Sequence, residues 1–211
     1  METYILDTNL FFNMQAGLDL GQKTEEVVVN LTQGIKKAKE HEQAMFLIPP
    51  RIVDEFLSFF ENKQQPFLQD FLSVITVQSP KAEEMLLPAS IFYKLVEDIR
   101  ARSYRGLTAG EEEVQKTARL FTGKEVMNKM QFEMSVGPLI KSFRERYRQA
   151  TRFGFIDSLA DLDLIMLAKE TEGMLVSADE GVIKWGRTIG VREMQVPVFG
   201  KKMKEYLHHR E

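Results

Sequence analysis

Five aspartates stand where short apolar segments end or where an apolar helical segment begins. They are Asp7, Asp157, Asp161, Asp163 and Asp179. Carboxylates gathered at such ends destabilise a fold unless a ligand binds them, and the usual ligand is hydrated Mg²⁺ or Mn²⁺. The arrangement therefore predicts a divalent-cation site of the kind that hydrolyses phosphodiesters.

The spacing of these aspartates indicates how the site is built. Asp157 and Asp161 are four residues apart and share one helix face, whereas Asp163 points away from that face in an ideal helix. We expect Asp163 to reach the site from its rim, to act through water, or to serve structurally. Asp7 begins Asp-Thr-Asn, which alone suits a simple turn; its combination with the C-terminal acids favours a site.

Three further residues are candidates for supporting the site. They are Asn9, Ser177 and Glu55. Glu55 belongs to a predicted helix over residues 51–60 and has an equally good structural interpretation, because the helix dipole favours acids in the first turn. Asp54 has the same alternative and a weaker claim to the site.

Hydrolysis of a phosphodiester needs an attacking water in line with the leaving group, a lowered pKa of that water, and a positive charge beside the leaving oxygen. Two Mg²⁺ ions roughly 3.5–4 Å apart supply all three, with carboxylates as ligands and without a catalytic histidine. The three histidines, His41, His208 and His209, are scattered along the chain, which agrees with this interpretation. The sequence contains no P-loop, dinucleotide-binding fingerprint or nucleophile elbow.

Short apolar runs alternate with amphipathic segments, which is typical of an α/β fold with a mainly parallel sheet flanked by helices. Such folds bind ligands beyond the carboxyl ends of the strands, where Asp7 and Asp179 are expected. Strands are predicted over residues 4–6, 45–48, 74–77, 174–176 and, as an edge strand, 196–198. Helices are predicted over residues 24–41, 51–60 and 201–211, among others.

Residues 80–152 contain no strand-like run and are predicted to form a long helical insertion. We expect one helix to end near Gly106, another to begin at residues 108–111 with a capping-box pattern, and Gly137-Pro138 to interrupt the later part. Its methionine-rich stripe is weak support for a dimer, because such stripes are usually plain packing. The α/β domain then comprises residues 1–79 and 153–211.

A basic helix within the insertion is the candidate surface for nucleic acid. Its positive residues fall three, four and four positions apart, so they share a face. They are Lys141, Arg144, Arg148 and Arg152, with Arg100, Arg102 and Arg105 as second choices. The alternative is a solvated charged face, the usual fate of such runs, but the adjacent acid cluster favours binding to a phosphate backbone.

Composition sets further limits. The chain has 211 residues, 44% of them hydrophobic, and no cysteine, which excludes disulfides, thiolate zinc sites and cysteine nucleophiles. A formal net charge of −3 argues at first sight against a nucleic-acid partner, but cations bound at the acid cluster would offset it. With no signal-peptide pattern and no apolar run of membrane length, we expect a cytoplasmic protein without membrane contact.

The same segments resemble the PIN-type nucleases, with an N-terminal strand ending in Leu6-Asp7-Thr8-Asn9 and Glu55 in the helix after the second strand. A narrower resemblance covers essentially the whole chain and is to the minimal, RNA-free ribonucleases P of bacteria and archaea. The segments that carry it are Arg100-Ala101-Arg102, Gly106-Leu107, Tyr147-Arg148, Gly154-Phe155-Ile156-Asp157-Ser158, Asp161-Leu162-Asp163, Val176-Ser177-Ala178-Asp179-Glu180-Gly181 and Trp185.

This resemblance implies four residues that bind catalytic Mg²⁺ or Mn²⁺, and one helper. They are Asp7, Asp157, Asp161 and Asp179, with Asp163 as the helper. It implies an endoribonuclease that removes the 5′ leader from precursor tRNA. It also implies that the inserted helices form a spike that reads the tRNA by shape and pairs subunits into a homodimer and larger homo-oligomers. Residues 122–136 are longer and richer in methionine than the family pattern, which affects the expected shape of the spike and leaves the site unchanged.

Two other functions stay open. One is a toxin-type PIN endoribonuclease that acts on other RNA, although the long insertion argues against it because such toxins are compact. The other is a non-catalytic RNA-binding partner subunit that retains the fold. The near-complete acidic set argues against this second alternative, since a degenerate site is expected to lose carboxylates.

Overall fold

The computed structural model describes residues 1–152, 154, 156 and 158–208. It divides the chain into two compact units. The core unit comprises Met1–Leu87 and Ile156–Glu211, and the hairpin unit comprises Pro88–Phe155. The hairpin unit is therefore an insertion between two parts of the core unit.

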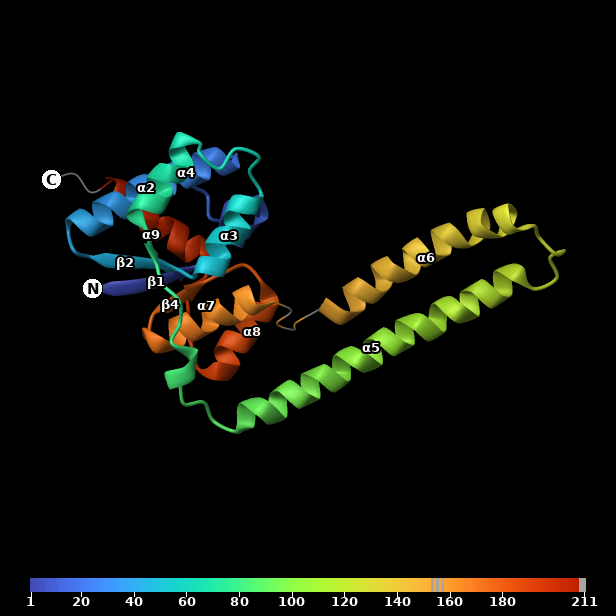
Figure 1. Ribbon diagram of the computed structural model, residues 1–211. Coiled ribbons are helices and arrows are strands. Elements are labelled where there is room, and N and C mark those ends of the chain that lie inside the picture. The colour runs from blue at the N-terminus through green and yellow to red at the C-terminus, as the bar shows by residue number, and fades with distance from the viewer. Residues whose placement is uncertain (153, 155, 157, 209–211) are drawn as a thin grey trace. The chain divides into compact units, whose positions relative to one another are not determined.

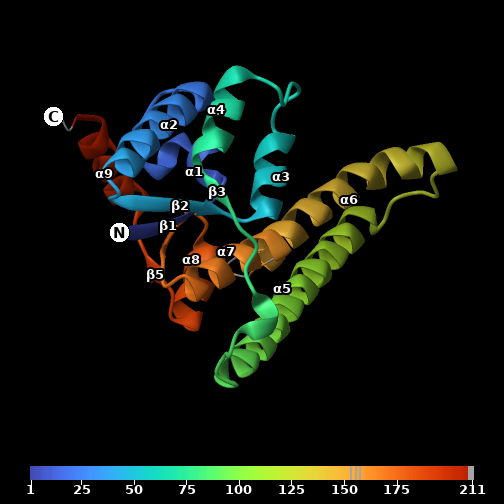
Figure 2. The same ribbon diagram turned by 60° about the vertical axis from the view of Figure 1, so that its left-hand side comes forward.

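A five-stranded parallel sheet forms the centre of the core unit, in the order β3-β2-β1-β4-β5. The strands are β1 (Glu2–Leu6), β2 (Ala44–Ile48), β3 (Thr76–Val77), β4 (Met174–Val176) and β5 (Arg192–Glu193). In the central strand β1, Ile5 lies beside Leu47 of β2 and Leu175 of β4. The strands β3 and β5 lie at the two edges (Figure 2). The predicted α/β class with a mainly parallel sheet is confirmed.

Helices cover both faces of this sheet, with α2, α4 and α9 on one face and α7 and α8 on the other (Figure 1). The helices of the core unit are α1 (Asn9–Phe12), α2 (Thr24–Glu40), α3 (Pro50–Ser58), α4 (Pro66–Val74), α7 (Leu159–Glu170), α8 (Glu180–Ile189) and α9 (Val196–His208), with 3₁₀ turns at Met14–Ala16 and Ala82–Glu84. The predicted helices over residues 24–41 and 51–60 are confirmed to within two residues.

The central strand is apolar because helices cover both of its faces. Tyr4, Ile5 and Leu6 are fully buried. The Tyr4 ring stacks on Phe46 of β2 with centroids 5.4 Å apart and packs against Phe199 of α9 at 5.3 Å. This packing fixes the end of β1, and with it the residue that follows.

The predicted edge strand over residues 196–198 is wrong. These residues begin α9, with Pro197 in the first turn. A proline cannot donate to a strand ladder, but its fixed φ suits the first turn of a helix. The edge strand is the short β5, whose Arg192 pairs with Met174 of β4.

The hairpin unit consists of two long antiparallel helices, α5 (Ser90–Phe121) and α6 (Lys129–Arg152) (Figure 1). The prediction of a helix end near Gly106 and a new start at residues 108–111 is wrong, because α5 runs through both. A Cβ at Gly106 would lie 2.7 Å from the Tyr147 ring and 3.2 Å from the Thr151 methyl group. Gly106 therefore permits close packing of the two helices and does not end one of them.

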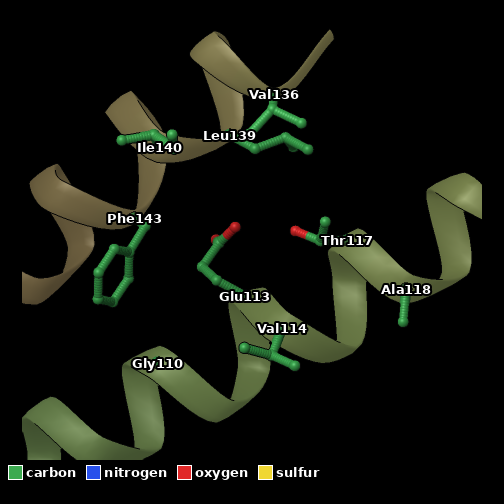
Figure 3. Close-up of a pocket in the computed structure, with 9 residues that line it drawn as sticks. All are labelled: Gly110, Glu113, Val114, Thr117, Ala118, Val136, Leu139, Ile140 and Phe143. Carbon is green, nitrogen blue, oxygen red and sulfur yellow. The ribbon is translucent and has the colours of Figure 1, made fainter. Parts of the chain in front are cut away.

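The predicted interruption at Gly137-Pro138 is also wrong, since α6 contains Pro138 in its interior. A proline there removes one hydrogen bond and costs about 3 kcal/mol. Val136 before it and Leu139 and Ile140 after it line the space facing α5 (Figure 3). Apolar packing on both sides of the proline outweighs its cost and keeps α6 continuous.

An apolar groove of about 500 Å³ lies between α5 and α6 (Figure 3). Glu113 on its floor is only 4% exposed. Its Oε1 accepts a hydrogen bond from Nη1 of Arg146 at 2.8 Å and lies 3.6 Å from Nζ of Lys116. The Arg146 hydrogen bond holds the pKa of Glu113 below its usual range. No helix within the described ranges, these two included, is both long and apolar enough to cross a membrane.

Candidate active site

Asp7 is a buried carboxylate at the carboxyl end of the central strand, directly after β1, and is 2% exposed. Its oxygens accept hydrogen bonds from the Ser177 hydroxyl at 2.5 Å and the Asn9 side-chain amide at 3.3 Å. The Asn9 backbone N–H and the Thr8 hydroxyl lie at 3.4 Å. All of these donors are neutral, so they solvate the charge of Asp7 without compensating it.

Ser177 connects the two acidic strand ends. The backbone N–H of Asp7 donates to the Val176 carbonyl oxygen at 3.1 Å, which brings the ends of β1 and β4 together. The Ser177 hydroxyl donates to Asp7 and accepts the backbone N–H of Asp179 at 3.0 Å. One buried hydroxyl therefore sets the positions of both acidic loops.

Asp179 also caps a helix. Its Oδ1 accepts the backbone N–H of Gly181 at 2.7 Å and of Val182 at 3.0 Å, at the start of α8. This is the usual arrangement of an N-cap aspartate. The cap fixes the orientation of the carboxylate, and Oδ2 takes no part in these bonds.

The pKa of Asp7 is raised above its ordinary value. Burial is the largest cause and the negative charge of Asp179 adds to it, whereas hydrogen bonds from Ser177 and Asn9 oppose it. A nearby cation lowers the pKa of a carboxylate and reverses such a shift. The environment of Asp7 is therefore one that a bound cation would stabilise.

The helix α7 brings further acids to the same edge of the sheet. It packs on β1 and β4 and leads through a tight turn into β4, so its N-terminus lies towards the carboxyl ends of the strands. The Ser158 hydroxyl caps it by accepting the backbone N–H of Asp161 at 3.0 Å. The partly buried Asp161 thus occupies the first turn. Asp157 lies outside the described residues.

Asp163, in the second turn of α7, forms an ion pair with Arg51 of α3. The distance from Nη1 of Arg51 to Oδ2 of Asp163 is 2.5 Å. Sequence reasoning missed Arg51, although its position in Pro49-Pro50-Arg51, directly beyond a strand, is a usable signal for a site at that edge. The ion pair suits a position at the rim as well as a structural role, so the role of Asp163 at the site stays a prediction.

The structure brings Asp7, Asn9, Ser177 and Asp179 together, while Glu55 is exposed in the second turn of α3. Within residues 1–152, 154, 156 and 158–208, no three acids or histidines are grouped so that they could hold a metal ion by themselves. The oxygen donors around Asp7 are of the type that hard cations prefer. The chemistry fits Mg²⁺ or Mn²⁺, and the complete ligand set stays a prediction.

The predicted RNA-binding residues all lie in the hairpin unit. Four of them are exposed on α6, namely Lys141, Arg144, Arg148 and Arg152. On α5, Arg100 is exposed and Arg102 is partly buried, whereas Nε of Arg105 donates to the Ala150 carbonyl oxygen at 2.7 Å. Arg105 therefore links the two helices, and α6 carries the exposed basic face.

Comparison with known proteins identifies the family of this chain. Residues 3–208 match the family model described as PINc domain ribonuclease. Relatives called RNA-free ribonuclease P include one from Thermodesulfovibrio yellowstonii, 32% identical over 96% of this chain and 92% of the relative. Others come from Hyperthermus butylicus, 32% identical over 99% and 90%, and Nitrosococcus oceani, 34% identical over 91% and 89%. This chain is an endoribonuclease with a PIN domain and belongs to the RNA-free ribonuclease P family.

Proposed function

We propose that this chain removes the 5′ leader from precursor tRNA by hydrolysing one phosphodiester with the help of divalent cations. The relatives called RNA-free ribonuclease P match this chain over about nine tenths of their own length. The observation that carries the proposal is Asp7, a buried carboxylate at the end of the central strand that, among the described residues, receives only neutral donors. Perturbed acids of this kind concentrate at functional sites.

Mg²⁺ or Mn²⁺ would be held by carboxylates at this edge of the sheet. The proposed ligands are Asp7, Asp157, Asp161 and Asp179. When bound, such ions lower the pKa of the attacking water and stabilise the leaving oxygen. The chain's own part is to keep the carboxylates in place: Ser177 positions Asp7 and Asp179 through one hydroxyl, and the Ser158 cap fixes the helix turn that carries Asp161.

Substrate binding is assigned to the exposed basic face of α6. Its residues are Lys141, Arg144, Arg148 and Arg152, with Arg100 and Arg102 of α5 as further contributors. A-form RNA presents its backbone and 2′-hydroxyls more readily than its base edges, so these contacts read the shape of the tRNA. Removing one phosphate contact should lower the log–log salt slope of binding by about 0.7 to 1.

The hairpin unit also pairs copies of the chain in this proposal. Val114 and Ile140, which are 69% and 45% exposed, line the apolar groove in Figure 3. Exposed apolar patches mark interaction surfaces. Light scattering should find a homodimer or larger assembly for the unaltered chain and a smaller one for the Val114→Asp, Ile140→Asp variant. A monomer in both cases would contradict the pairing.

The experiment that tests the function is cleavage of a precursor tRNA carrying a 5′ leader. We expect a single cut at the leader junction with Mg²⁺, no cut with EDTA, and no cut by the Asp161→Asn variant. Asp70→Asn is the matched control, because Asp70 of α4 forms an exposed ion pair with Lys36 of α2, with 2.6 Å between Oδ1 and Nζ. This variant should cleave like the unaltered chain.

The other outcomes separate the alternatives. Cuts scattered through loops or in the anticodon would point to the toxin-type endoribonuclease. Tight binding that needs no metal and leads to no cleavage would favour the partner subunit and contradict the catalytic proposal. Loss of cleavage in Asp70→Asn as well as in Asp161→Asn would show that the loss in Asp161→Asn is not specific to the acidic edge, and would contradict the role given to Asp161.

A further inference from the structure

We infer that Arg51 binds a phosphate of the RNA beside the scissile bond, and that Asp163 serves as its positioning residue and not as a metal ligand. The inference rests on the proposed function, because it concerns the same edge of the sheet. The guanidinium of Arg51 would place a positively charged side chain at this acid-rich edge, where it could bind an anionic substrate.

The topology puts Arg51 at this edge. It is the second residue of α3, which begins directly beyond the carboxyl end of β2. The strand β2 pairs with the central strand in the register Ile5–Leu47, so the residues after Ile48 lie next to the turn that contains Asp7. The ends of two neighbouring strands thus place Asp7 and Arg51 at the same edge of the sheet.

The ion pair leaves most of the guanidinium free for a ligand. Nη1 of Arg51 donates to Oδ2 of Asp163 at 2.5 Å, and the side chains are 55% and 17% exposed. Across the ranges that the structure describes, the guanidinium has no other hydrogen-bond partner. An arginine has five N–H donors, so those not facing Asp163 can bind an anion.

Stabilisation of the fold is a poor explanation for this pair. Ion pairs with one well-exposed partner contribute little to stability. Orientation is the stronger explanation, because a guanidinium held from one side presents its planar fork to a phosphate with little loss of side-chain freedom. The charge of Asp163 is also already compensated by Arg51, whereas the described donors to Asp7 are neutral.

The test is a double-mutant cycle in single-turnover cleavage of precursor tRNA. We expect Arg51→Ala to lower the rate roughly 10- to 100-fold, Arg51→Lys to restore part of it, and Asp163→Asn to lower it less than Arg51→Ala. If Asp163 acts through Arg51, Asp163→Asn causes no further loss in the Arg51→Ala background. It also leaves unchanged the Mg²⁺ concentration that gives half the maximal rate.

Binding provides a second readout that a purely structural role would not move. With the cleavage-blocking Asp161→Asn change present throughout, Arg51→Ala should reduce the log–log salt slope of tRNA binding by about 0.7 to 1. Arg187→Ala is the matched control, because Arg187 pairs with Glu193 with exposures of 66% and 23%. It lies near the C-terminal end of α8, away from the Asp179 cap.

Each outcome decides the matter. Absence of cleavage by the unaltered chain would contradict the proposed function itself. If the unaltered chain cleaves and Arg51→Ala behaves like Arg187→Ala, the role of Arg51 is refuted. If the losses from Arg51→Ala and Asp163→Asn multiply, or if Asp163→Asn raises the Mg²⁺ requirement, Asp163 is a metal ligand and the inference is overturned.

Discussion

The core unit and the hairpin unit each bury an acid, and the two acids differ in the charge of their hydrogen-bond partners. Asp7 is 2% exposed and Glu113 is 4% exposed. Glu113 is bound by Arg146, which lowers its pKa. Asp7 accepts from neutral donors only within the described part of the chain, and burial raises its pKa. The charge of Glu113 is compensated from within the hairpin unit, whereas Asp7 has no ion pair with any residue that the structure describes. Burial alone therefore does not distinguish the two acids, but the charge of their partners does.

The largest expected effect separates the two acids by activity. Asp7→Asn should reduce single-turnover cleavage of precursor tRNA on the order of 10³-fold, because a metal ligand affects several kcal/mol of transition-state stabilisation. Glu113→Gln should stay within about tenfold of the unaltered chain, since any effect arises through the shape of the hairpin. Equal losses in both variants would erase the distinction between them.

A second experiment loosens the hairpin without touching the acids. Gly106→Leu would force a side chain against the Tyr147 ring and should destabilise the hairpin unit by about 1–3 kcal/mol. Hydrogen exchange of α5 and α6 would report it. Gly110→Ala is the control, because a Cβ added at Gly110 would meet the Phe143 ring at 3.8 Å, an ordinary contact distance; it should stabilise α5 by about 0.5–1 kcal/mol. Unchanged exchange in Gly106→Leu would show that the helices do not depend on this close approach.

A third experiment measures how much the ion pairs of Glu113 contribute to the stability of the hairpin unit. Glu113→Gln removes the charge that Arg146 and Lys116 share and should lower the urea midpoint for unfolding of the hairpin unit, because the charge-assisted hydrogen bond from Arg146 is lost. Glu112→Gln, at an exposed acid that also contacts Arg146, should have a smaller effect in the same urea titration. A larger loss from Glu112→Gln would mean that burial of Glu113 is unimportant.

The smallest effect is on the stability of the core unit, and its sign is the informative part. Because the folded-state pKa of Asp7 is raised, its contribution to stability is present below about pH 3.9 and is lost as pH rises through the folded pKa. At neutral pH in EDTA, Asp7→Asn should therefore raise Tm by about 2–4 °C. Mg²⁺ should raise Tm for the unaltered chain and not for the variant. A fall in Tm for Asp7→Asn in EDTA would contradict an uncompensated charge.

Much of the core unit follows from local pattern. The apolar runs at the strands and the helix over residues 24–41 are visible in the sequence because each element obeys its own periodicity. Asp7 and Asp179 are found the same way, as the residues that follow two buried strands. Asp157 and the full set of metal ligands stay predictions.

The errors arise where a distant contact overrides a local signal. Gly106 has the sequence features of a helix end, but it admits Tyr147 from a helix that begins more than twenty residues later. Pro138 has the sequence features of a helix break, but packing of α6 against α5 outweighs the cost of a proline inside the helix. Arg51 was missed because its partner Asp163 lies 112 positions away along the chain, and no local pattern connects the two.

The hydrogen bond from Ser177 to Asp7 joins residues 170 positions apart. Chains are synthesised and begin to fold from the N-terminus, so Asp7 emerges from the ribosome long before the loop after β4. Until that loop arrives, the central strand lacks one of its two neighbours and the acids are not assembled. A nascent chain that has not yet reached Ser177 therefore lacks the hydroxyl that positions both Asp7 and Asp179.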